Sequence, residues 1–479
     1  MDGATRNDHG TGLKREDMPK KHQGKCVVFD VGKTFAKVSV VDVEGVVWTE
    51  RRRAIPHFDA LLYRAFAVDT LHDWLIEQLR DLGSQYFIDR IIPVTHGATC
   101  AFLDDEHKLV QPIQDYESAV PPEYVRAYTR IRPGFDETQS PSLPLGLNLG
   151  SQIFWHSRRA PEMFGRVRWI LNYPQYWAWR LSGALCNEVT SMGCHTDLWC
   201  PERKDFSSLA VKQGWADRFP EMHPAWEPVA TLRSDIAAAA GLPPSVKVCV
   251  GAHDTNAALA SIIIGSDTDP PALLSTGTWF IAMAPGASAD DLVSHRDCLA
   301  NVDVFGRPVP CARFMGGRVY DSFMGNGVVV DEAALCAVMR KGTSGLPVFL
   351  EGPGVCPGLN ATLPSLGESA EERAARGLLY VALMTSACLD LVRASDQLLI
   401  EGPAAGNALL CGLIAALRPG PVVVEDRRNA VSLGAARLAF YDRPAPQARI
   451  RQLVTPVLRD DIRRFRELWR GRVSAELAA

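Results

Sequence analysis

Two short segments of the same design, far apart in the chain, constrain the fold more than any other feature of this sequence. Residues 26–41 read CVVFDVGKTFAKVSVV, in which an apolar run reaches a turn at Gly32 and an alternating run follows. Residues 273–285 read LLSTGTWFIAMAP and repeat this plan, with hydroxyl side chains on both sides of the turn glycine. Each pattern predicts a β-hairpin. Two hairpins of one design predict two homologous lobes.

The boundary between the lobes is expected near Gly251. The length of 479 residues suits two or three domains of ordinary size. At residues 246–252 a strand-like run, VKVCVGA, leads into an alanine-rich helical pattern, which marks the entry to the second lobe. The expected parts are a flexible leader over residues 1–25, a first lobe over 26–250, a second lobe over 251–445 and a helical extension over 446–479.

Hydrophobic periodicity predicts the other main elements. Residues 91–94 are expected to form a buried strand, and the proline-punctuated stretch 117–149 an elaborated loop. Residues 169–181 are rich in aromatic side chains, but the apolar positions recur at helical spacing, which favours core packing over sugar stacking. The second lobe is expected to hold a long helix and a short strand within 371–400, a helix at 408–417, a strand at 422–424, a core helix at 431–441 and an amphipathic helix at 461–477.

The composition and charge exclude several classes of protein. With 47% hydrophobic and 22% charged residues the chain has the composition of a folded globular protein. Its net charge of -4 argues against a dedicated nucleic-acid or anionic-membrane surface. The polar N-terminus has no secretory signal, and no run of about 18 uncharged apolar residues is present to span a bilayer. We therefore expect a cytoplasmic protein without a nucleic-acid or membrane partner.

The cysteines do not predict a metal site. Twelve cysteines are scattered along the chain without a C-x-x-C pair, which favours buried free thiols over a zinc ribbon or a thioredoxin motif. The densest group, Cys194, His195 and Cys200, has a spacing that matches no common zinc finger. No metal is assigned to it.

The first hairpin turn has the composition of a phosphate grip. Gly32-Lys33-Thr34 matches the end of a Walker A loop, but Val27 stands where that loop needs its first glycine, and no long helix follows. In a hairpin turn, backbone N–H groups and the Thr34 hydroxyl would instead donate to phosphate oxygens. Because a carboxylate repels polyphosphate unless a cation intervenes, Asp30 would hold Mg²⁺, directly or through water. An ordinary hairpin is the alternative interpretation.

Two further turns complete the pattern of a nucleotide site. Ser275–Thr278 is a second hydroxyl-rich glycine turn, placed to grip phosphates from the opposite lobe. Residues 402–407, GPAAGN, follow an apolar strand, and their small side chains leave room for a flat adenine ring. A plain strand-to-helix loop is the alternative for this third turn. The matched pair of glycine turns is stronger evidence for nucleotide binding than either turn alone.

Asp254 is the candidate catalytic carboxylate. It stands where a strand opens into a helix, so a structural N-cap is the simplest interpretation. A helix N-terminus also stabilises the ionised carboxylate by about 0.3 to 1 kcal/mol. Asp254 would then accept the proton of a hydroxyl that attacks the γ-phosphoryl group in line, a contribution of about 10² to 10⁴ in rate. His253 would bind a sugar hydroxyl or be a core histidine.

The order of these motifs resembles the FGGY carbohydrate kinases, in the superfamily that shares the fold of actin, hexokinase and the heat-shock chaperone ATPases. The resemblance rests on DVGKT, HDT, STGTW and GPAAGN and covers residues 26–441. It implies an α/β fold of two ribonuclease-H-like lobes around a central cleft, ATP with Mg²⁺ in the cleft, and phosphorylation of a sugar or polyol hydroxyl. It implies Asp254 as catalytic base, Asp30 as the metal-associated acid, and a nucleotide site of Asp30, Gly32, Lys33, Thr34, Thr276, Gly277, Thr278, Gly402, Gly406 and Asn407.

The same resemblance places the sugar against the first lobe. The residues it implies are His96, Gly97 and Gln152, together with His253 and Asp254. Asp115 and Glu117 are possible additions to this sugar site, but a solvated loop is the expected location.

A histidine before the catalytic acid resembles rhamnulose and fuculose kinases. Glycerol kinases commonly carry a glutamine after the acid, where Thr255 stands here. We therefore expect a ketose as acceptor, either a deoxyhexulose or a pentulose. A glycerol or tetritol kinase, and a non-catalytic nucleotide-binding regulator of the same fold, are the alternatives.

Three residues depart from the common pattern or extend it. Pro403 stands where many relatives carry a second glycine, which removes an N–H donor from the third turn. Lys33 is unusual beside the first turn, where it contacts phosphate or solvent. Arg318, after two glycines, is a candidate cation for the cleft. The sequence does not determine the oligomeric state, and a homodimer is one expectation.

Overall fold

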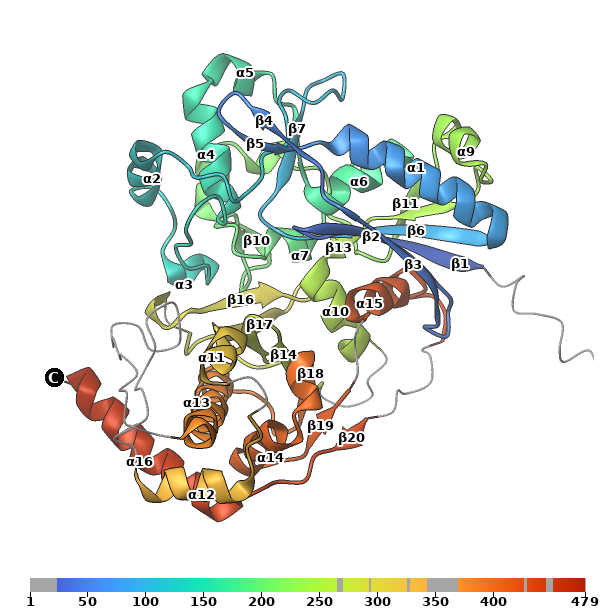
Figure 1. Cartoon of the computed structure of the whole chain (residues 1–479). Helices are drawn as coiled ribbons and strands as arrows, with labels where there is room; N and C mark the ends of the chain where they lie inside the picture. Colours follow the sequence, from blue (N-terminus) through green and yellow to red (C-terminus); the bar gives the residue numbers. More distant parts are fainter. Residues whose placement is uncertain are drawn as a thin grey trace, which may run out of the picture.

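The computed structural model describes residues 24–264, 270–292, 294–324, 328–342, 369–425, 429–444 and 451–478. The expected leader, residues 1–25, falls almost entirely outside these ranges, as do the first residues of the expected extension. The chain forms two sheet-containing lobes (Figure 1).

The first lobe is built on a seven-stranded mixed sheet. Its strand order is β11-β12-β6-β1-β2-β3, and β13 pairs with β6 beside β12. The strands β1 and β2 are the predicted antiparallel hairpin, and β6 runs parallel to β1. The bounds are β1 Lys25–Val31, β2 Phe35–Val41, β3 Val47–Ala54, β6 Ile88–Thr95, β11 Pro228–Thr231, β12 Lys247–Cys249 and β13 Ala252–His253.

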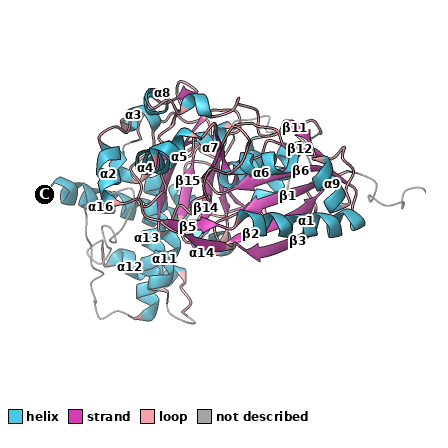
Figure 2. Cartoon of the chain, turned by 90° about the horizontal axis from the view of Figure 1, so that it is seen from above, coloured by secondary structure: helices cyan, strands magenta, loops and turns pink. Residues whose placement is uncertain are grey.

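The two faces of this sheet are covered by different helices. Alternate residues of a strand point to opposite faces. Val27 and Phe29 of β1 pack against α1 (Val68–Gln85) and α6 (Tyr173–Ser182), whereas Val28 packs toward α10 (Asp254–Ile263) and α15 (Ala430–Ala439). Figure 2 shows α1 beside the strands of this sheet, with α9 (Ser234–Ala240) at its far end.

The first lobe carries further elements outside this sheet. The hairpin of β4 and β5 and the pair of β7 and β8 lie there with several short helices (Figure 1). Their bounds are β4 His57–Ala60, β5 Tyr63–Phe66, β7 Cys100–Leu103, α2 Pro122–Thr129, α3 Phe135–Thr138, α4 Leu149–Arg159, α5 Pro161–Gly165, β8 Trp169–Asn172, α7 Val189–Met192, β9 Trp199–Cys200, β10 Asp205–Phe206 and α8 Ser208–Lys212.

The second lobe repeats the plan of the first. Its sheet has the order β16-β17-β15-β14-β18-β19-β20, and the antiparallel hairpin of β14 and β15 has β18 as its parallel neighbour. The bounds are β14 Ala272–Thr276, β15 Phe280–Met283, β16 Cys298–Val302, β17 Pro308–Phe314, β18 Leu398–Glu401, β19 Val422–Val424, β20 Gln452–Leu453, α11 Gly316–Phe323, α12 Glu332–Arg340, α13 Ala370–Leu391, α14 Ala408–Leu417 and α16 Arg459–Ala478.

The helix α13 is the core helix of this lobe. By length and composition it is apolar enough to cross a membrane, but 89% of its most apolar 18-residue window is buried inside the protein. It packs against the sheet and the helices α11, α12 and α14.

The structure confirms most of the predicted elements and corrects two. Both hairpins, the strand within β6, and the elements of the second lobe lie where the periodicity predicts them. The segment 169–181 is helical only from Tyr173, because residues 169–172 pair with β7 as the strand β8. The segment 117–149 is not simply a loop, since α2 and α3 lie within it. Tyr173 and Trp177 are fully buried, as core packing requires.

Candidate active site

The first glycine turn joins β1 to β2 and places Asp30 at the strand end. The Gly32 N–H donates to the Phe35 carbonyl at 3.0 Å, which closes the turn. The Asp30 carboxylate is buried, with the Lys37 ammonium 3.6 Å from one oxygen. Burial raises the pKa of Asp30 to about 7, the negative charge of Asp254 adds to this, and Lys37 opposes it. Thr34 is exposed at the tip of the turn.

Asp254 is the first residue of α10, directly after β13. The N-cap position belongs to His253, so the interpretation of Asp254 as an N-cap is wrong. One carboxylate oxygen, Oδ1, accepts hydrogen bonds from the backbone N–H and the hydroxyl of Thr255. In the described parts of the chain no donor is found for Oδ2, and the side chain is 25% exposed. The carboxylate is therefore fixed on one side and open on the other.

His253 contacts the candidate base and is itself enclosed. Its Nε2 lies 3.5 Å from Asp254 Oδ1 and 3.5 Å from Cys194 Sγ. Its backbone N–H donates to the Thr190 hydroxyl at 3.0 Å. Burial lowers the pKa of His253, although the charge of Asp254 opposes this. A Cβ at Gly97 would lie 3.0 Å from His253 Nε2. Any larger residue at position 97 would therefore push the His253 ring out of its position.

His96 lies in an aromatic pocket of the first lobe. Its ring centre is 5.1 Å from that of Tyr116 and 5.3 Å from that of Tyr173. Its Nδ1 bonds the Gly97 carbonyl at 2.8 Å, so Nδ1 carries the proton and Nε2 is an acceptor. Burial lowers the pKa of His96 to about 4, so the ring is neutral at pH 7. Nε2 is buried without a partner among the described residues.

Gln152 stands beside this pocket as a brace. Its amide nitrogen donates to the Ala98 carbonyl at 2.7 Å and to the Gly146 carbonyl, and the side chain is buried. It therefore holds the loop that carries His96 and Gly97 against the segment before α4.

Lys33 pairs with carboxylates of the first lobe. Its ammonium bonds Asp115 and lies 3.2 Å from Glu117, over the ring of Tyr116. The expectation that Asp115 lies in a solvated loop is wrong, because its side chain is fully buried between Lys33 and His57. Burial opposes ionisation, but Lys33 holds the pKa of Asp115 below its usual range. Glu117 is half exposed, as expected.

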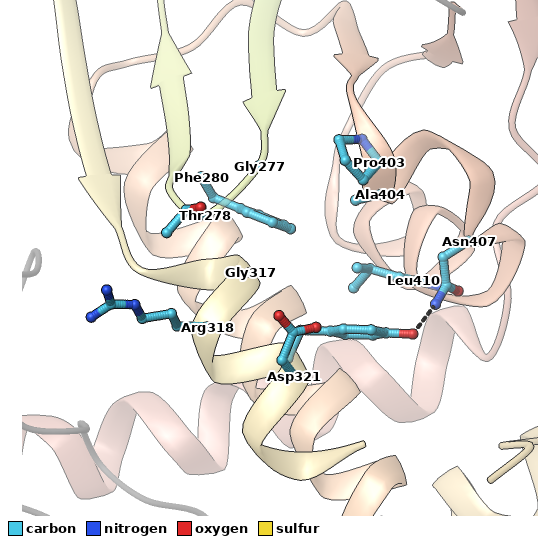
Figure 3. A pocket seen from close by; sticks show the side chains of 11 residues that line it. Gly277, Thr278, Phe280, Gly317, Arg318, Asp321, Pro403, Ala404, Asn407 and Leu410 are labelled. Carbon is cyan, nitrogen blue, oxygen red and sulfur yellow. Dashed lines mark hydrogen bonds between the residues drawn. The ribbon is translucent and has the colours of Figure 1, made fainter. Parts of the chain in front are cut away.

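The second and third glycine turns interlock at a cavity of about 340 Å³ (Figure 3). Gly402 has φ +86°, and a Cβ there would lie 2.0 Å from the Thr276 carbonyl oxygen. The Thr276 hydroxyl donates to the Glu401 carbonyl and accepts from the Ala404 N–H. The residues that line the cavity are Gly277, Thr278, Phe280, Gly317, Arg318, Tyr320, Asp321, Pro403, Ala404, Asn407 and Leu410.

Helix α11 forms the other side of this cavity. A Cβ at Gly317 would lie 2.1 Å from the Gly277 carbonyl oxygen, so the helix start touches the second turn. Asn407 caps α14 through the Leu410 N–H and donates to the Tyr320 hydroxyl at 3.0 Å (Figure 3).

Some predicted nucleotide residues meet at this cavity, and others do not. Gly277, Thr278 and Asn407 line it, Arg318 joins them, and Thr276 and Gly402 lie directly behind. Gly406 belongs to the adjoining 3-10 turn but does not line the cavity. The sequence interpretation missed Phe280, Tyr320, Asp321 and Leu410. The one sequence signal for these cavity residues was the glycine pair before Arg318, because glycine lets the start of α11 approach the second turn closely.

The donor set near Asp254 suits a hard cation. No group of three or more His, Cys, Asp or Glu side chains gathers in the described residues. The charge of Asp254 nonetheless contributes to the raised pKa of Asp30, so the two carboxylates act on each other's surroundings at the ends of β13 and β1. Mg²⁺ is usually bound by one or two carboxylates together with substrate phosphates, so the Asp30 carboxylate fits the ion.

Two sheets of one plan, each with a glycine-turn hairpin and a parallel neighbouring strand, are the architecture of the actin-like ATPase fold. The family model described as the N-terminal domain of the FGGY family of carbohydrate kinases matches residues 26–261. The model described as the C-terminal domain of FGGY carbohydrate kinases matches residues 268–448. The chain belongs to the FGGY family of carbohydrate kinases, and the predicted family and fold are confirmed.

Similarity to individual proteins supports this family assignment. A crystal structure of a carbohydrate kinase from Novosphingobium aromaticivorans has a TM-score of 0.86 at 36% identity, covering 95% of this chain and 99% of that chain. The L-fuculokinase of Salmonella typhi is 26% identical over 277 residues, which is 56% of this chain and 58% of that protein. The chain thus matches little more than half of this curated relative. A glycerol kinase from Plasmodium falciparum, solved with ADP, shares the fold with a TM-score of 0.74 at 13% identity, covering 95% and 98%.

Proposed function

We propose that this protein transfers the γ-phosphoryl group of ATP to a hydroxyl of a small ketose, a deoxyhexulose or a pentulose, with Asp254 as general base. The observation that carries the proposal is the state of the Asp254 carboxylate. It is fixed through Oδ1 by Thr255, it is open at Oδ2, and it stands at a helix N-terminus beside the first glycine turn. A base in this position is ready to accept a hydroxyl proton.

The two glycine turns would hold ATP between the lobes. Residues 276–278 and the cavity in front of 402–407 suit the phosphates and the adenosine, and residues 32–34 would approach the phosphates from the first lobe. The cavity volume of about 340 Å³ lies within the range of small-ligand sites. Lys33 would have to leave Asp115 to reach a phosphate.

Asp30 would hold Mg²⁺, which when bound would neutralise charge on the transferring phosphoryl group. The rest of the chemistry belongs to side chains of the protein. Asp254 orients the attacking hydroxyl and takes its proton, and His253 keeps the carboxylate beside the first lobe.

The acceptor would lie against His96, Gly97 and His253, with Gln152 as the brace of that wall. The neutral His96 offers an unpaired acceptor nitrogen, which suits a sugar hydroxyl. The likeness to a protein named L-fuculokinase supports a sugar rather than glycerol, and family membership favours an enzyme over a non-catalytic regulator.

The test is an ADP-release assay over deoxyhexuloses, pentuloses, tetritols and glycerol. We expect turnover with a ketose, and Asp254→Asn should lower kcat by at least about 10² to 10⁴ while ATP still binds. Asp235→Asn is the matched control, because Asp235 is an exposed acid in the first turn of α9, away from the cleft. Retained turnover in Asp254→Asn would exclude the role of this carboxylate. Turnover of polyols alone would exclude the ketose.

A further inference from the structure

Arg313 of the second lobe points toward the first lobe. Alternate residues of β17 face the same side of the sheet. Val309 and Cys311 lie in the buried cluster that the second sheet shares with α10, α15 and the first sheet. Arg313 follows them on that side of β17, in register with Ile281 of β15. Its side chain is therefore on the face of the second sheet that packs toward α10 and the first lobe.

The guanidinium of Arg313 is held in one position from two sides. Its Nε donates to Asp297 Oδ1 at 2.9 Å, and its centre lies 4.8 Å from the ring centre of Trp279. Asp297 has φ +45°, a left-handed conformation that a non-glycine residue keeps only when its surroundings impose it. Trp279 directly follows Thr278 of the second glycine turn. Among the described residues no acceptor is found for either terminal nitrogen of Arg313.

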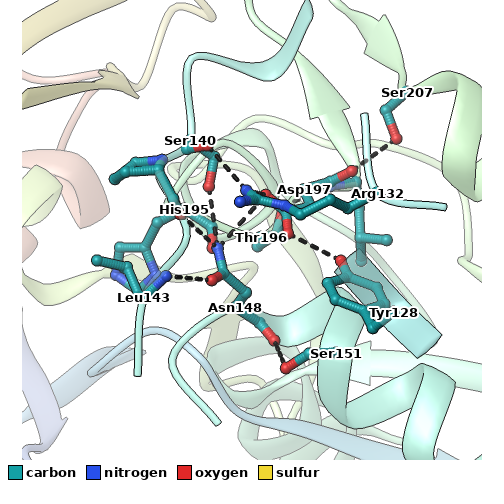
Figure 4. A network of polar contacts seen from close by, with 12 residues as sticks. Tyr128, Arg132, Ser140, Leu143, Asn148, Ser151, His195, Thr196, Asp197 and Ser207 are labelled. Carbon is teal, nitrogen blue, oxygen red and sulfur yellow. Dashed lines mark hydrogen bonds and ion pairs between the residues drawn. The ribbon is translucent and has the colours of Figure 1, made fainter. Parts of the chain in front are cut away.

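A loop of the first lobe beside His253 is equally well fixed. In residues 194–197 both His195 and Asp197 have positive φ, +41° and +65°. Figure 4 shows the polar network that holds this loop: Arg132 and the Tyr128 hydroxyl bind the Asp197 carboxylate at 2.7 and 2.8 Å. In the same network Asn148 donates to the His195 carbonyl at 3.0 Å.

This loop also touches the second lobe and the candidate base. A Cβ at Gly193 would lie 2.2 Å from the Val302 side chain of β16. On its other side, Cys194 Sγ lies 3.5 Å from His253 Nε2, which in turn lies 3.5 Å from Asp254 Oδ1. The loop is thus one side chain away from the candidate base, Asp254.

His195 offers an acceptor on this loop. Its Nδ1 bonds the Leu147 carbonyl at 2.8 Å, so the proton is on Nδ1 and the lone pair on Nε2. Burial lowers the pKa of His195 to about 4, and the neighbouring His253 and Arg313 add to this effect. The ring is therefore neutral at pH 7.

We propose that Arg313 is a specificity-determining residue that donates hydrogen bonds to the carbonyl oxygen of an open-chain ketose, while His195 accepts from the neighbouring hydroxyl. A guanidinium only donates and a carbonyl oxygen only accepts, so the two groups match. A polyol presents at the same place a hydroxyl whose hydrogen needs a further acceptor. Because Asp297 already balances the charge of Arg313, the site suits a neutral ketose rather than a sugar acid. This inference rests on the proposed function.

The test compares a ketose with the polyol obtained by reducing its carbonyl. Arg313→Gln should lower kcat/KM for the ketose by about 10- to 100-fold, the strength of a hydrogen bond to a charged group, mainly through KM. The value for the polyol should change less than about threefold. Arg313→Lys should restore only part of the loss, since it keeps the charge but not the planar pair of donors.

Arg307→Gln is the matched control. Arg307 pairs with Asp303 at 2.7 Å and stacks on Phe305, but it lies at the other end of the β16–β17 hairpin. It should leave both substrates unaffected. An unchanged ketose value in Arg313→Gln would refute the inference, and so would an equal loss for ketose and polyol, which would indicate a role in phosphoryl transfer or in folding. A wild-type protein inactive on every sugar and polyol would instead refute the proposed function.

Discussion

Replacing Gly402 by alanine tests whether the two glycine turns of the second lobe form one unit. Gly402 has φ +86° and ψ -168°, a region of backbone conformation that is essentially restricted to glycine. An alanine Cβ would also lie 2.0 Å from the Thr276 carbonyl oxygen and 2.8 Å from its hydroxyl oxygen. Either the turn at 402 or the end of β14 must therefore move.

The size of the effect follows from two contributions. An unfavourable backbone conformation costs about 1 to 3 kcal/mol. Displacing Thr276 weakens its hydrogen bonds to Glu401 and Ala404, each of which contributes about 0.5 to 1.5 kcal/mol. The free energy of unfolding should fall by at least about 2 kcal/mol. If each lobe unfolds as one unit, this corresponds to a loss of at least about 4 °C in Tm. Because Ala404 lines the cavity, KM for ATP should rise about tenfold, which corresponds to about 1.4 kcal/mol.

Gly286→Ala is the control that separates backbone strain from the contact with Thr276. Gly286 has φ +82°, but a Cβ there would meet no atom within 4 Å. It should lower Tm, as backbone strain does, and leave KM for ATP unchanged. Thermal unfolding and steady-state kinetics on both variants decide the question. If Gly402→Ala binds ATP as the wild type does, or if Gly286→Ala weakens ATP equally, the turns are not coupled.

Two further predictions concern buried charges. Burial and the charge of Asp254 raise the pKa of Asp30 from 3.8 to about 7. Between pH 4 and pH 7, roughly, the metal-free folded protein therefore keeps a proton on Asp30 that the unfolded chain has released. The free energy of unfolding falls as the pH rises through this range. Asp30→Asn should therefore raise Tm in EDTA more at pH 8 than at pH 5, and an equal gain at both would contradict this. Lys33→Met leaves Asp115 buried without its partner and should cost about 3 to 5 kcal/mol. The double variant Lys33→Met, Asp115→Asn should recover part of that Tm loss, and strictly additive losses would contradict the pairing.

The sequence predicted the parts of the fold that depend on local patterns. A β-hairpin is specified by alternation and by its turn residues, so both glycine turns could be found without any structure. The order of the four motifs then indicated the family, which the family models confirm. The strand β8 was missed because the local pattern of its four residues also fits the start of the helix that follows. Only the pairing with β7 makes these residues a strand.

The sequence could not predict contacts between distant segments. Lys33 and Asp115 are 82 positions apart, and Asp115 is buried because its loop docks on the β4–β5 hairpin, where its N–H donates to the Arg64 carbonyl. A carboxylate in a polar stretch gives no local sign of such a partner. Tyr320 was missed likewise, because the cavity that it lines is completed by Asn407, 87 positions away.

The position of Asp254 depends on a contact that belongs to no motif. Helix α10, which begins with Asp254, packs along α15 from the end of the second lobe (Figure 1). A Cβ at Gly434 of α15 would lie 1.7 Å from the Ala257 carbonyl oxygen, so the two helices approach with backbone against backbone. Both helices share one buried cluster with the two sheets. The candidate base is therefore held at the junction of the lobes, and any relative movement of the lobes must act on the helix that carries it.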